Sequence, residues 1–297
     1  MMKQITILLL ILTLLFAGGC NQQAQPNEKK ENNQENIQSS NDKTQIQGEE
    51  STKPLSNEKN KTPDLAGGKE SEVREPHPLT LSDLRTKYPN IFVLSGPSHV
   101  RRVALTFDDG PDLQFTPQIL DVLKKHNVKA TFFIVGNRAK AHPEIVKRIV
   151  REGHAIGNHT WNHANLPKLP IESVRNQIIQ TDNTLKNIIG YKPKLFRAPY
   201  GAMTEETVQM LGKMGYTAVG WTVDSLDWKG LSKEAVSDNV LSNIFPGAII
   251  LQHSAGGKGE DLSGTVKALS EIIHKLKNDR VEFYTVPDLL GIPWKRP

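Results

Sequence analysis

Two adjacent carboxylates, Asp108 and Asp109, directly follow the apolar residues 103–107 and precede a Gly-Pro pair. An apolar run of this kind predicts a strand, and Gly-Pro predicts a turn, so the two acids are expected at the exit of a strand. Parallel α/β folds hold their chemistry at this end of their strands, because the rim is rigid below and open above. Asp, Gly and Pro are also ordinary turn formers, so these residues alone leave a solvated turn open.

A second reactive cluster, His159-Thr160-Trp161-Asn162-His163, follows a predicted strand at residues 155–158. Two histidines at this spacing lie on one face of a helical turn, close enough to ligate one metal ion. Taken alone, such a pair is more often explained by surface or core-satisfied histidines. One of the paired aspartates would supply a third ligand from another strand end. A His, His and carboxylate set leaves coordination positions open, as a catalytic metal site requires.

Three further polar clusters each follow a predicted strand, at residues 197–201, 224–228 and 251–253. In the first, Arg197 could hold a carboxylate in a fixed geometry, or be a surface residue beside a Pro-Tyr-Gly turn. The second joins two acids to a tryptophan, which suits either a sugar-stacking wall or a capped turn. In the third, His253 emerges from a buried apolar run and could act as a general acid.

Strand-like and helix-like segments alternate through the second half of the chain. Near-continuous apolar strands between helices predict a parallel sheet with helices outside it. About seven β/α units in roughly 200 residues predict an α/β fold with a single distorted or incomplete (β/α) barrel. The expected strands are 103–107, 130–135, 155–158, 195–196, 217–222, 248–251 and 281–285, and the expected helices are 117–126, 143–151, 171–189, 204–213, 232–241 and 265–276. The carboxyl ends of these strands share one rim, so the five clusters are expected to converge.

Residues 1–19 have the pattern of a signal peptide, with Lys3 near the start, an apolar run at 5–16 and small residues before Cys20. The run is too short for a comfortable membrane span. Cys20, the single cysteine of the chain, resembles the lipidated cysteine of bacterial lipoproteins, so we expect a lipid anchor on the outer face of the cell membrane. Ala17 stands where that motif usually has leucine, which leaves cleavage without lipidation open. A single cysteine excludes an intrachain disulfide.

Residues 20–78 are rich in Gln, Asn, Glu, Lys and Ser, and no aromatic residue occurs between Phe16 and Tyr88. Such a segment cannot bury enough apolar surface to offset its ordering entropy, which predicts a disordered polar linker. Residues 79–100 are expected to pack onto a catalytic domain at 101–297. The net charge of +5 would suit nucleic acid, anionic lipid or an anionic wall polymer. For an exported protein we favour the wall.

The five motifs TFDDG, HTWNH, RAPYG, DSLDW and LQH occur in this order, and together they resemble those of the polysaccharide deacetylases with a NodB-homology domain, carbohydrate esterase family 4. The resemblance covers about residues 103–290 and includes every chemically essential position. It implies a distorted (β/α) barrel that hydrolyses N-acetyl groups on an amino-sugar polymer with the help of a divalent metal. The protein would then be a hydrolase acting on linear amides.

The resemblance also implies a role for each matching residue in the reaction. The metal ligands would be Asp109, His159 and His163. Asp108 would be the general base with Arg197 as its partner, and His253 would be the general acid, oriented by Asp227.

The remaining matching residues would contact the substrate. The backbone N–H of Tyr200 would help to bind the oxyanion that develops during hydrolysis. Leu251 would line the acetyl pocket, Trp228 would form a wall of the sugar groove, and Pro199 and Tyr200 would complete the binding site.

The expected partner is a cell-wall glycan, and the preferred substrate is the N-acetylglucosamine of peptidoglycan. Chitin oligomers, an exopolysaccharide or muramic acid are alternatives within the enzyme class, and a wall-binding protein whose site no longer turns over is the alternative outside it. The completeness of the motifs favours the enzyme. No recognition motif supports nucleic-acid binding, and a monomer is expected. Zn²⁺ is the preferred metal, although Co²⁺, Ni²⁺ or Mn²⁺ could occupy the same ligands.

Overall fold

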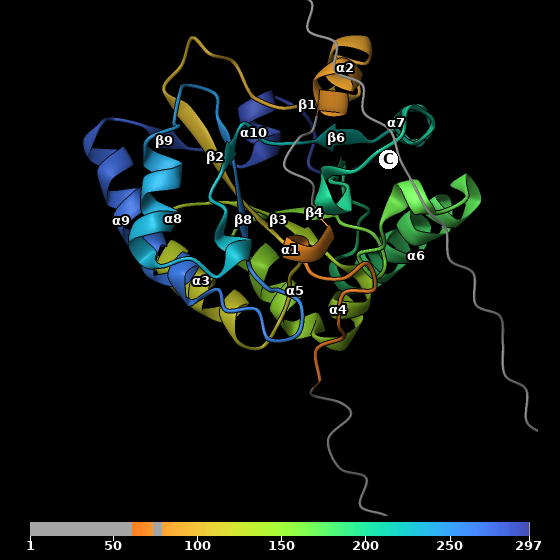
Figure 1. Cartoon of the computed structure of the whole chain (residues 1–297), viewed down its shortest axis with the longest axis horizontal. Coiled ribbons are helices and arrows are strands. Elements are labelled where there is room, and N and C mark those ends of the chain that lie inside the picture. Colours follow the sequence, from red (N-terminus) through yellow and green to blue (C-terminus); the bar gives the residue numbers. More distant parts are fainter. Residues whose placement is uncertain (1–60, 74–78, 297) are drawn as a thin grey trace, which may run out of the picture. The chain divides into compact units, whose positions relative to one another are not determined.

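Eight parallel strands follow one another side by side in a single sheet (Figure 1). Their order across the sheet is β1 (Phe92–Val93), β6 (Thr217–Val219), β5 (Leu195–Phe196), β4 (Ala155–Asn158), β3 (Thr131–Ile134), β2 (Arg102–Asp108), β8 (Ile249–His253) and β7 (Val223–Asp224). A ninth strand, β9 (Glu282–Phe283), pairs with the start of β2. Within the described residues no ladder joins β1 to β7, so the barrel is open between them. The predicted incomplete (β/α) barrel is confirmed.

The structure is a computed structural model that describes residues 61–73 and 79–296. All of these residues belong to one compact unit of the chain, which runs from residue 55 to residue 297. The predicted signal peptide, Cys20 and residues 20–60 of the predicted linker lie outside the described residues. Among the helices of the described part, none is long and apolar enough to cross a membrane.

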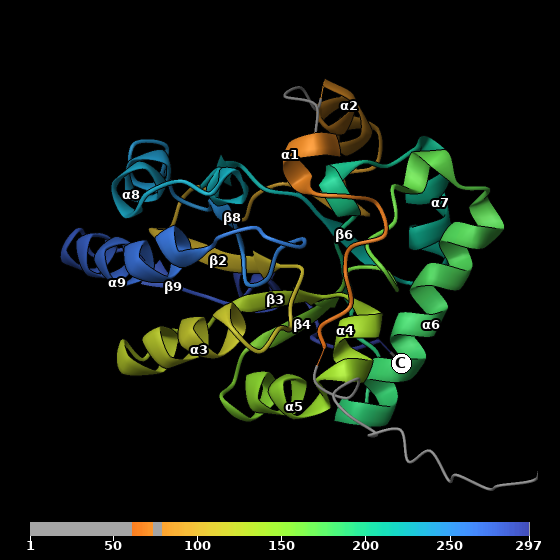
Figure 2. The same cartoon turned by 60° about the horizontal axis from the view of Figure 1, so that its bottom comes forward.

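Helices cover the outside of the sheet because each presents one apolar stripe to it (Figures 1 and 2). The covering helices are α3 (Phe115–Lys125), α5 (Pro143–Arg151), α6 (Ile171–Ile189), α7 (Glu205–Lys213), α8 (Lys233–Leu241) and α9 (Ser263–Asn278). In α3, for example, Ile119, Leu120 and Leu123 are buried at helical spacing. The shorter helices are α1 (Glu70–Val73), α2 (Leu79–Lys87), α4 (Gly136–Ala141) and α10 (Val286–Leu290).

The strand register brings the predicted site residues to one face of one rim. Asp108, the last residue of β2, is paired with His253, the last residue of β8. Asn158 at the end of β4 is paired with Phe196 at the end of β5, so His159 and Arg197 leave these two strands side by side. Parallel pairing therefore gathers residues that are far apart in sequence.

The boundaries of α5 and α6 match the predicted helices, and Gly190 ends α6 with a φ of 83°, a left-handed conformation that glycine adopts without strain. The expected strand at 217–222 ends at Val219 as β6, and residues 223–224 form the separate strand β7. Gly220 N still donates to Val93 O beside β1, whereas Thr222 N donates to Ile249 O of β8, so the chain changes neighbours between the two strands. At this break the carbonyl groups of Val219 and Gly220 accept hydrogen bonds from the buried Arg197 side chain.

Part of the expected disordered linker is packed against the domain, which corrects the prediction for residues 61–73. We call this segment the strap; it begins at Lys61 and ends with helix α1. Leu65 is its single buried apolar side chain. Several of its hydrogen bonds to the domain use backbone groups of the strap, such as that from Ala66 N to Asn162 O and that from Tyr200 Oη to Gly68 O. Composition indicates whether a segment can bury apolar side chains, but not whether its backbone can hydrogen-bond to a domain. The predicted disordered linker therefore extended too far toward the C-terminus.

Residues 79–100 are built into the barrel. Phe92 and Val93 form β1 on the edge of the sheet beside β6. Phe92 is buried together with Leu84 of α2 in an apolar cluster that also includes residues of α6 and α7. This part of the chain therefore completes one side of the core.

We expect Phe132→Ala to lower the free energy of unfolding by about 3–5 kcal/mol, because it removes a large side chain from a closed core. Phe132 has no exposed surface, and its ring stacks on Phe107 with centroids 5.2 Å apart. The measurement is denaturant unfolding of the full chain. Leu113→Ala is the control, since Leu113 is 53% exposed and its truncation should change stability by less than about 0.5 kcal/mol. Equal effects of the two substitutions would contradict this description of the core.

Candidate active site

Three potential metal-ligating atoms meet at the rim of the barrel. Asp109 Oδ1 lies 3.3 Å from His159 Nε2 and 3.1 Å from His163 Nε2. All three atoms are buried and have no hydrogen-bond partner within the described part of the chain. Burying unpaired polar atoms is costly, so a cation that accepts all three lone pairs would remove that cost. The donor set therefore fits a divalent metal ion, as the sequence predicted.

Each histidine is held in the tautomer that a metal ligand requires. His159 Nδ1 lies 2.7 Å from the carbonyl oxygen of Arg197, which can only accept, so Nδ1 carries the proton and Nε2 presents its lone pair. Tyr200 Oη donates to the carbonyl oxygen of Gly68 and is therefore free to accept from His163 Nδ1 at 3.1 Å. Partners of this kind orient metal-binding histidines in many proteins.

The two histidines do not lie on a helical turn, and this part of the prediction was wrong. The segment is an irregular loop in which Thr160 and His163 have φ values of 67° and 60°. Asn158 Oδ1 accepts a hydrogen bond from Thr160 N, and Thr160 Oγ1 accepts one from His163 N. These side-chain bonds compensate for the left-handed backbone and turn both imidazoles toward Asp109.

The second aspartate, Asp108, forms a buried ion pair with Arg197. Arg197 Nη1 donates to Asp108 Oδ1 at 2.8 Å and also to Thr106 Oγ1. The remaining guanidinium donors bind the carbonyl oxygens of Val219 and Gly220, and the cation lies over the ring of Phe133. Arg197 is thus fixed on all sides, and it fixes the Asp108 carboxylate in turn.

His253 is paired with Asp227 on the other side of Asp108. His253 Nδ1 lies 2.7 Å from Asp227 Oδ1, and Asp227 Oδ2 accepts hydrogen bonds from His253 N and from Thr265 Oγ1. Burial by itself would lower the pKa of His253, but the charge and hydrogen bond of Asp227 raise that pKa well above its usual 6.5. Asp227 thus favours the protonated imidazole of His253, whose Nε2 is directed away from Asp227.

The predicted substrate-contacting residues surround these groups. Leu251 is buried on β8 and is paired with Thr106, on the same face of the sheet as Asp108 and His253. Pro199 and Tyr200 lie in a short 3₁₀ turn, η3 (Pro199–Gly201), that follows β5.

Trp228 is half-buried in a second 3₁₀ turn, η4 (Asp227–Lys229), next to the His253 partner Asp227. The five predicted clusters thus converge on one rim of the barrel, and their chemical roles stay predictions.

Three neighbours of the site were not found from the sequence. Thr265, at the start of α9, holds Asp227. Arg138 of α4 is buried and donates to the carbonyl oxygens of Asp109, Gly256 and Pro63. Glu70 of the strap reaches His253, with 3.7 Å between Oε1 and Nε2. None of the three belongs to a cluster at a strand end, which was the signal that identified the others.

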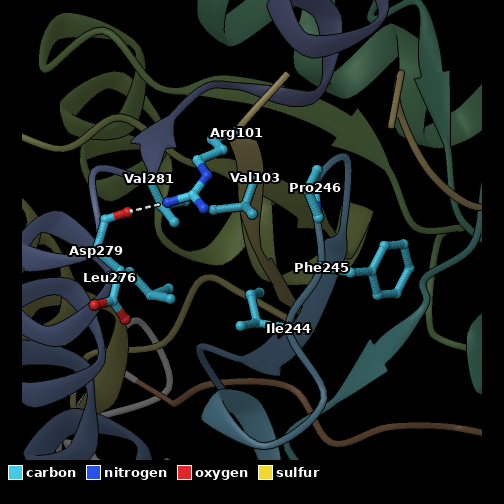
Figure 3. A pocket seen from close by; sticks show the side chains of 8 residues that line it. All are labelled: Arg101, Val103, Ile244, Phe245, Pro246, Leu276, Asp279 and Val281. Carbon is cyan, nitrogen blue, oxygen red and sulfur yellow. Dashed lines mark hydrogen bonds between the residues drawn. The ribbon is translucent and has the colours of Figure 1, made fainter. Parts of the chain in front are cut away.

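A pocket lies at the opposite end of β2 from the acids (Figure 3). It is lined by Arg101 and Val103 at the start of β2, by residues 244–246 and by the end of α9. Arg101 Nη1 donates to the carbonyl oxygen of Asp279 there. The pocket contains no residue of the predicted site and lies at the amino end of the strand, where parallel barrels do not hold their chemistry.

Residues 95–219 match the sequence profile of the polysaccharide deacetylases. A peptidoglycan-N-acetylglucosamine deacetylase from Bacillus cereus is 50% identical over 198 residues, which are 67% of this chain and 71% of that protein. This chain therefore belongs to the polysaccharide deacetylases, carbohydrate esterase family 4. Its fold also resembles a solved peptidoglycan N-acetylglucosamine deacetylase in complex with 4-naphthalen-1-yl-N-oxidanyl-benzamide, with a TM-score of 0.70 and 48% identity over 73% of this chain and all of the other.

A further structural neighbour is a pseudoenzyme of the same family from Bacillus anthracis. Its TM-score is 0.62, and it is 31% identical over 67% of this chain and 68% of its own. Because the fold also occurs in a pseudoenzyme, activity must be argued from the residues of the site and not from the fold alone.

We expect His159→Ala to abolish stoichiometric binding of the divalent metal, because it removes one of three protein ligands. Metal content of the purified full chain, measured by inductively coupled plasma mass spectrometry, checks this directly. His126→Ala is the control, since His126 bonds to Ser270 away from the rim. A His159→Ala protein that retains one metal ion per chain would refute the ligand assignment.

We expect Asp227→Asn to move the alkaline limb of the kcat/KM profile toward lower pH by roughly 1–3 units. The direction follows from the pKa of His253, which Asp227 raises. His253 must be protonated to act as the acid. Without the Asp227 carboxylate, His253 loses its proton at a lower pH, and activity falls there. Deacetylation rates measured across pH give the limb directly. An unchanged alkaline limb would show that Asp227 does not tune the acid.

Proposed function

We propose that this protein is a metal-dependent deacetylase that hydrolyses the N-acetyl groups of N-acetylglucosamine in peptidoglycan. One observation carries the proposal. A buried carboxylate held by an arginine and a buried imidazole held by a carboxylate lie at the same rim as a His, His and Asp ligand set. These are the base, the acid and the metal site that amide hydrolysis needs.

A metal held by Asp109, His159 and His163 would polarise the acetyl carbonyl and acidify the attacking water. Asp108, fixed by Arg197, accepts the proton that this water gives up. An amine anion is a very poor leaving group, so His253 Nε2 donates a proton to the amide nitrogen as the carbon–nitrogen bond breaks. The backbone N–H of Tyr200 donates to the oxyanion, whose charge develops only during the reaction. The products are acetate and a free amino sugar.

The similarity to peptidoglycan-N-acetylglucosamine deacetylases supports peptidoglycan as the substrate. The alternatives are chitin oligomers or an exopolysaccharide, whose N-acetyl groups undergo the same chemistry. A wall-binding protein without turnover is disfavoured, because Asp108, the three ligands and His253 are all present and brought together.

Zn²⁺ is the proposed metal, since one carboxylate and two imidazoles with an open position suit catalytic zinc. Co²⁺, Ni²⁺ or Mn²⁺ would occupy the same ligands, and their availability decides between them. We further propose that the chain is exported as a monomer and anchored by a lipid on Cys20 to the outer face of the cell membrane. The sequence of residues 1–20 and the wall-glycan substrate support this location.

We expect the full-length protein to release acetate from purified peptidoglycan, to lose this activity on chelation and to regain it when zinc is restored. Asp108→Asn should keep the metal and the fold but lower kcat by about 10²–10⁴-fold, because the general base is lost. Acetate is measured by a coupled assay, with chitin oligomers as the second substrate. Acetate release from chitin oligomers but not from peptidoglycan would show that the substrate is a chitin oligomer and not peptidoglycan. No release from either polymer by the zinc-loaded protein would contradict the proposed function.

A further inference from the structure

We propose that the strap, residues 61–73, is an autoinhibitory segment that holds Glu70 in the position of the reacting amide and must leave before a glycan can bind. The inference rests on the proposed function, since it treats the glycan as the competitor of the strap. It adds to that function a closed state of the same site.

The catalytic groups are closed off from solvent while the strap is in place. Asp108 is 3% exposed, His253 is 2% exposed and His163 has no exposed surface. A sugar polymer must bring an acetyl carbonyl to the metal and its amide nitrogen to His253. These side chains offer almost no surface to a polymer in the described arrangement, which we therefore treat as a closed one.

Glu70 occupies the place where the leaving nitrogen must be. Nδ1 of His253 is engaged by Asp227, so Nε2 is the ring atom that can protonate the substrate. Glu70 Oε1 lies 3.7 Å from this atom, and the Glu70 side chain is buried. The carboxylate thus lies close to the proton donor of the reaction, in the space that substrate and acetate would need.

The rest of the strap lies over the metal ligands and the predicted sugar groove. Ala66 N and Gly67 N donate to the carbonyl oxygens of Asn162 and His163, and Gly68 O accepts from Tyr200 Oη. Helix α1 contacts the turn η4, which carries Trp228. In Figures 1 and 2, α1 and the orange segment before it lie along the rim where β4 and β8 end.

The strap has the properties of a segment that can be released. Its start is anchored, because Arg138 Nε donates to Pro63 O and Lys258 N donates to Asp64 Oδ1. Its later part, which covers the site, has no buried apolar side chain among residues 66–73. Glu70 Oε2 is buried and has no hydrogen-bond partner in the part of the chain that the structure describes, so closing the strap carries a desolvation cost.

A reversible disulfide tests whether the strap must open. A Cβ atom placed on Gly257 would lie 3.0 Å from Lys69 Cγ, which is one bond from Lys69 Cβ. The two Cβ atoms would therefore be at most about 4.5 Å apart, the upper end of the range that a disulfide spans. The variant is the full chain with Cys20→Ser, Lys69→Cys and Gly257→Cys, zinc-loaded. The matched controls carry Cys20→Ser with only one of the two new cysteines.

In the oxidised double-cysteine protein, acetate release from peptidoglycan should fall by roughly tenfold or more and return on reduction, because the open population is removed. The single-cysteine controls should not respond to oxidation. Equal activity of the oxidised and reduced forms would overturn the proposal. Failure of the disulfide to form, shown by thiol titration and mass spectrometry, would also overturn it, because the strap would not be seated beside Gly257.

A readout without turnover separates this proposal from the proposed function. Hydrogen–deuterium exchange of the strap amides, among them Ala66 N and Gly67 N, which bond to the domain, should be slower in the oxidised form than in the reduced form when followed by mass spectrometry. If the parent protein and the reduced variant both release no acetate, the proposed function fails, and the exchange rates still decide whether the strap opens. Equal rates in the two forms would contradict a strap that opens.

Substitution of Glu70 distinguishes an inhibitory carboxylate from a catalytic one. Glu70→Ala and Glu70→Gln should both raise kcat/KM by favouring the open strap. Glu72→Ala is the matched control, because Glu72 is an exposed carboxylate of the same helix. A lower kcat/KM in both Glu70 variants, with Glu72→Ala unchanged, would show that Glu70 assists the reaction and would contradict the proposal.

Discussion

The site depends on three buried ligand atoms that have no hydrogen-bond partner among residues 61–73 and 79–296: Asp109 Oδ1, His159 Nε2 and His163 Nε2. Metal ligands bind in their deprotonated forms, so Asp109 would contribute an anionic oxygen to this set. The two imidazoles present lone pairs because their Nδ1 atoms are engaged elsewhere. An arrangement that leaves these atoms unpaired inside a protein is stable when a cation completes it.

Two buried ion pairs and the strap lie beside this centre. Asp108 and Arg197 form one pair, and His253 and Asp227 form the other. Buried charges of this kind are costly unless paired, which explains why each is held by several hydrogen bonds from different elements of the fold. The strap adds Glu70 to the same buried space, and its position makes access for the glycan a step separate from the chemistry.

Much of the fold and the site could be predicted from local patterns. The helix at Ile171–Ile189 and the strand at Ala155–Asn158 follow from periodicity and from Gly190, and Asp108, His159, Arg197 and His253 were found because each follows an apolar strand. The predicted helical turn at His159 and His163 failed because side-chain bonds from Asn158 and Thr160 support a left-handed backbone there.

Long-range contacts set the limit of these predictions. Thr265 contacts Asp227 from a helix distant in sequence, and Arg138 links the strap to the Asp109 loop through backbone carbonyls. Glu70 stands in a segment whose composition is that of a linker, yet it is buried against His253. Neither spacing nor composition encodes such contacts, because they depend on where the chain returns to the rim.

The central claim is that these three atoms hold the catalytic metal, and anomalous diffraction tests it most directly. Crystals of the full-length protein grown with zinc would be measured on both sides of the zinc absorption edge. The account predicts one strong anomalous peak at about 2.0–2.2 Å from Asp109 Oδ1, His159 Nε2 and His163 Nε2. Zinc-containing crystals with no peak between these atoms, or with the metal on other ligands, would contradict it.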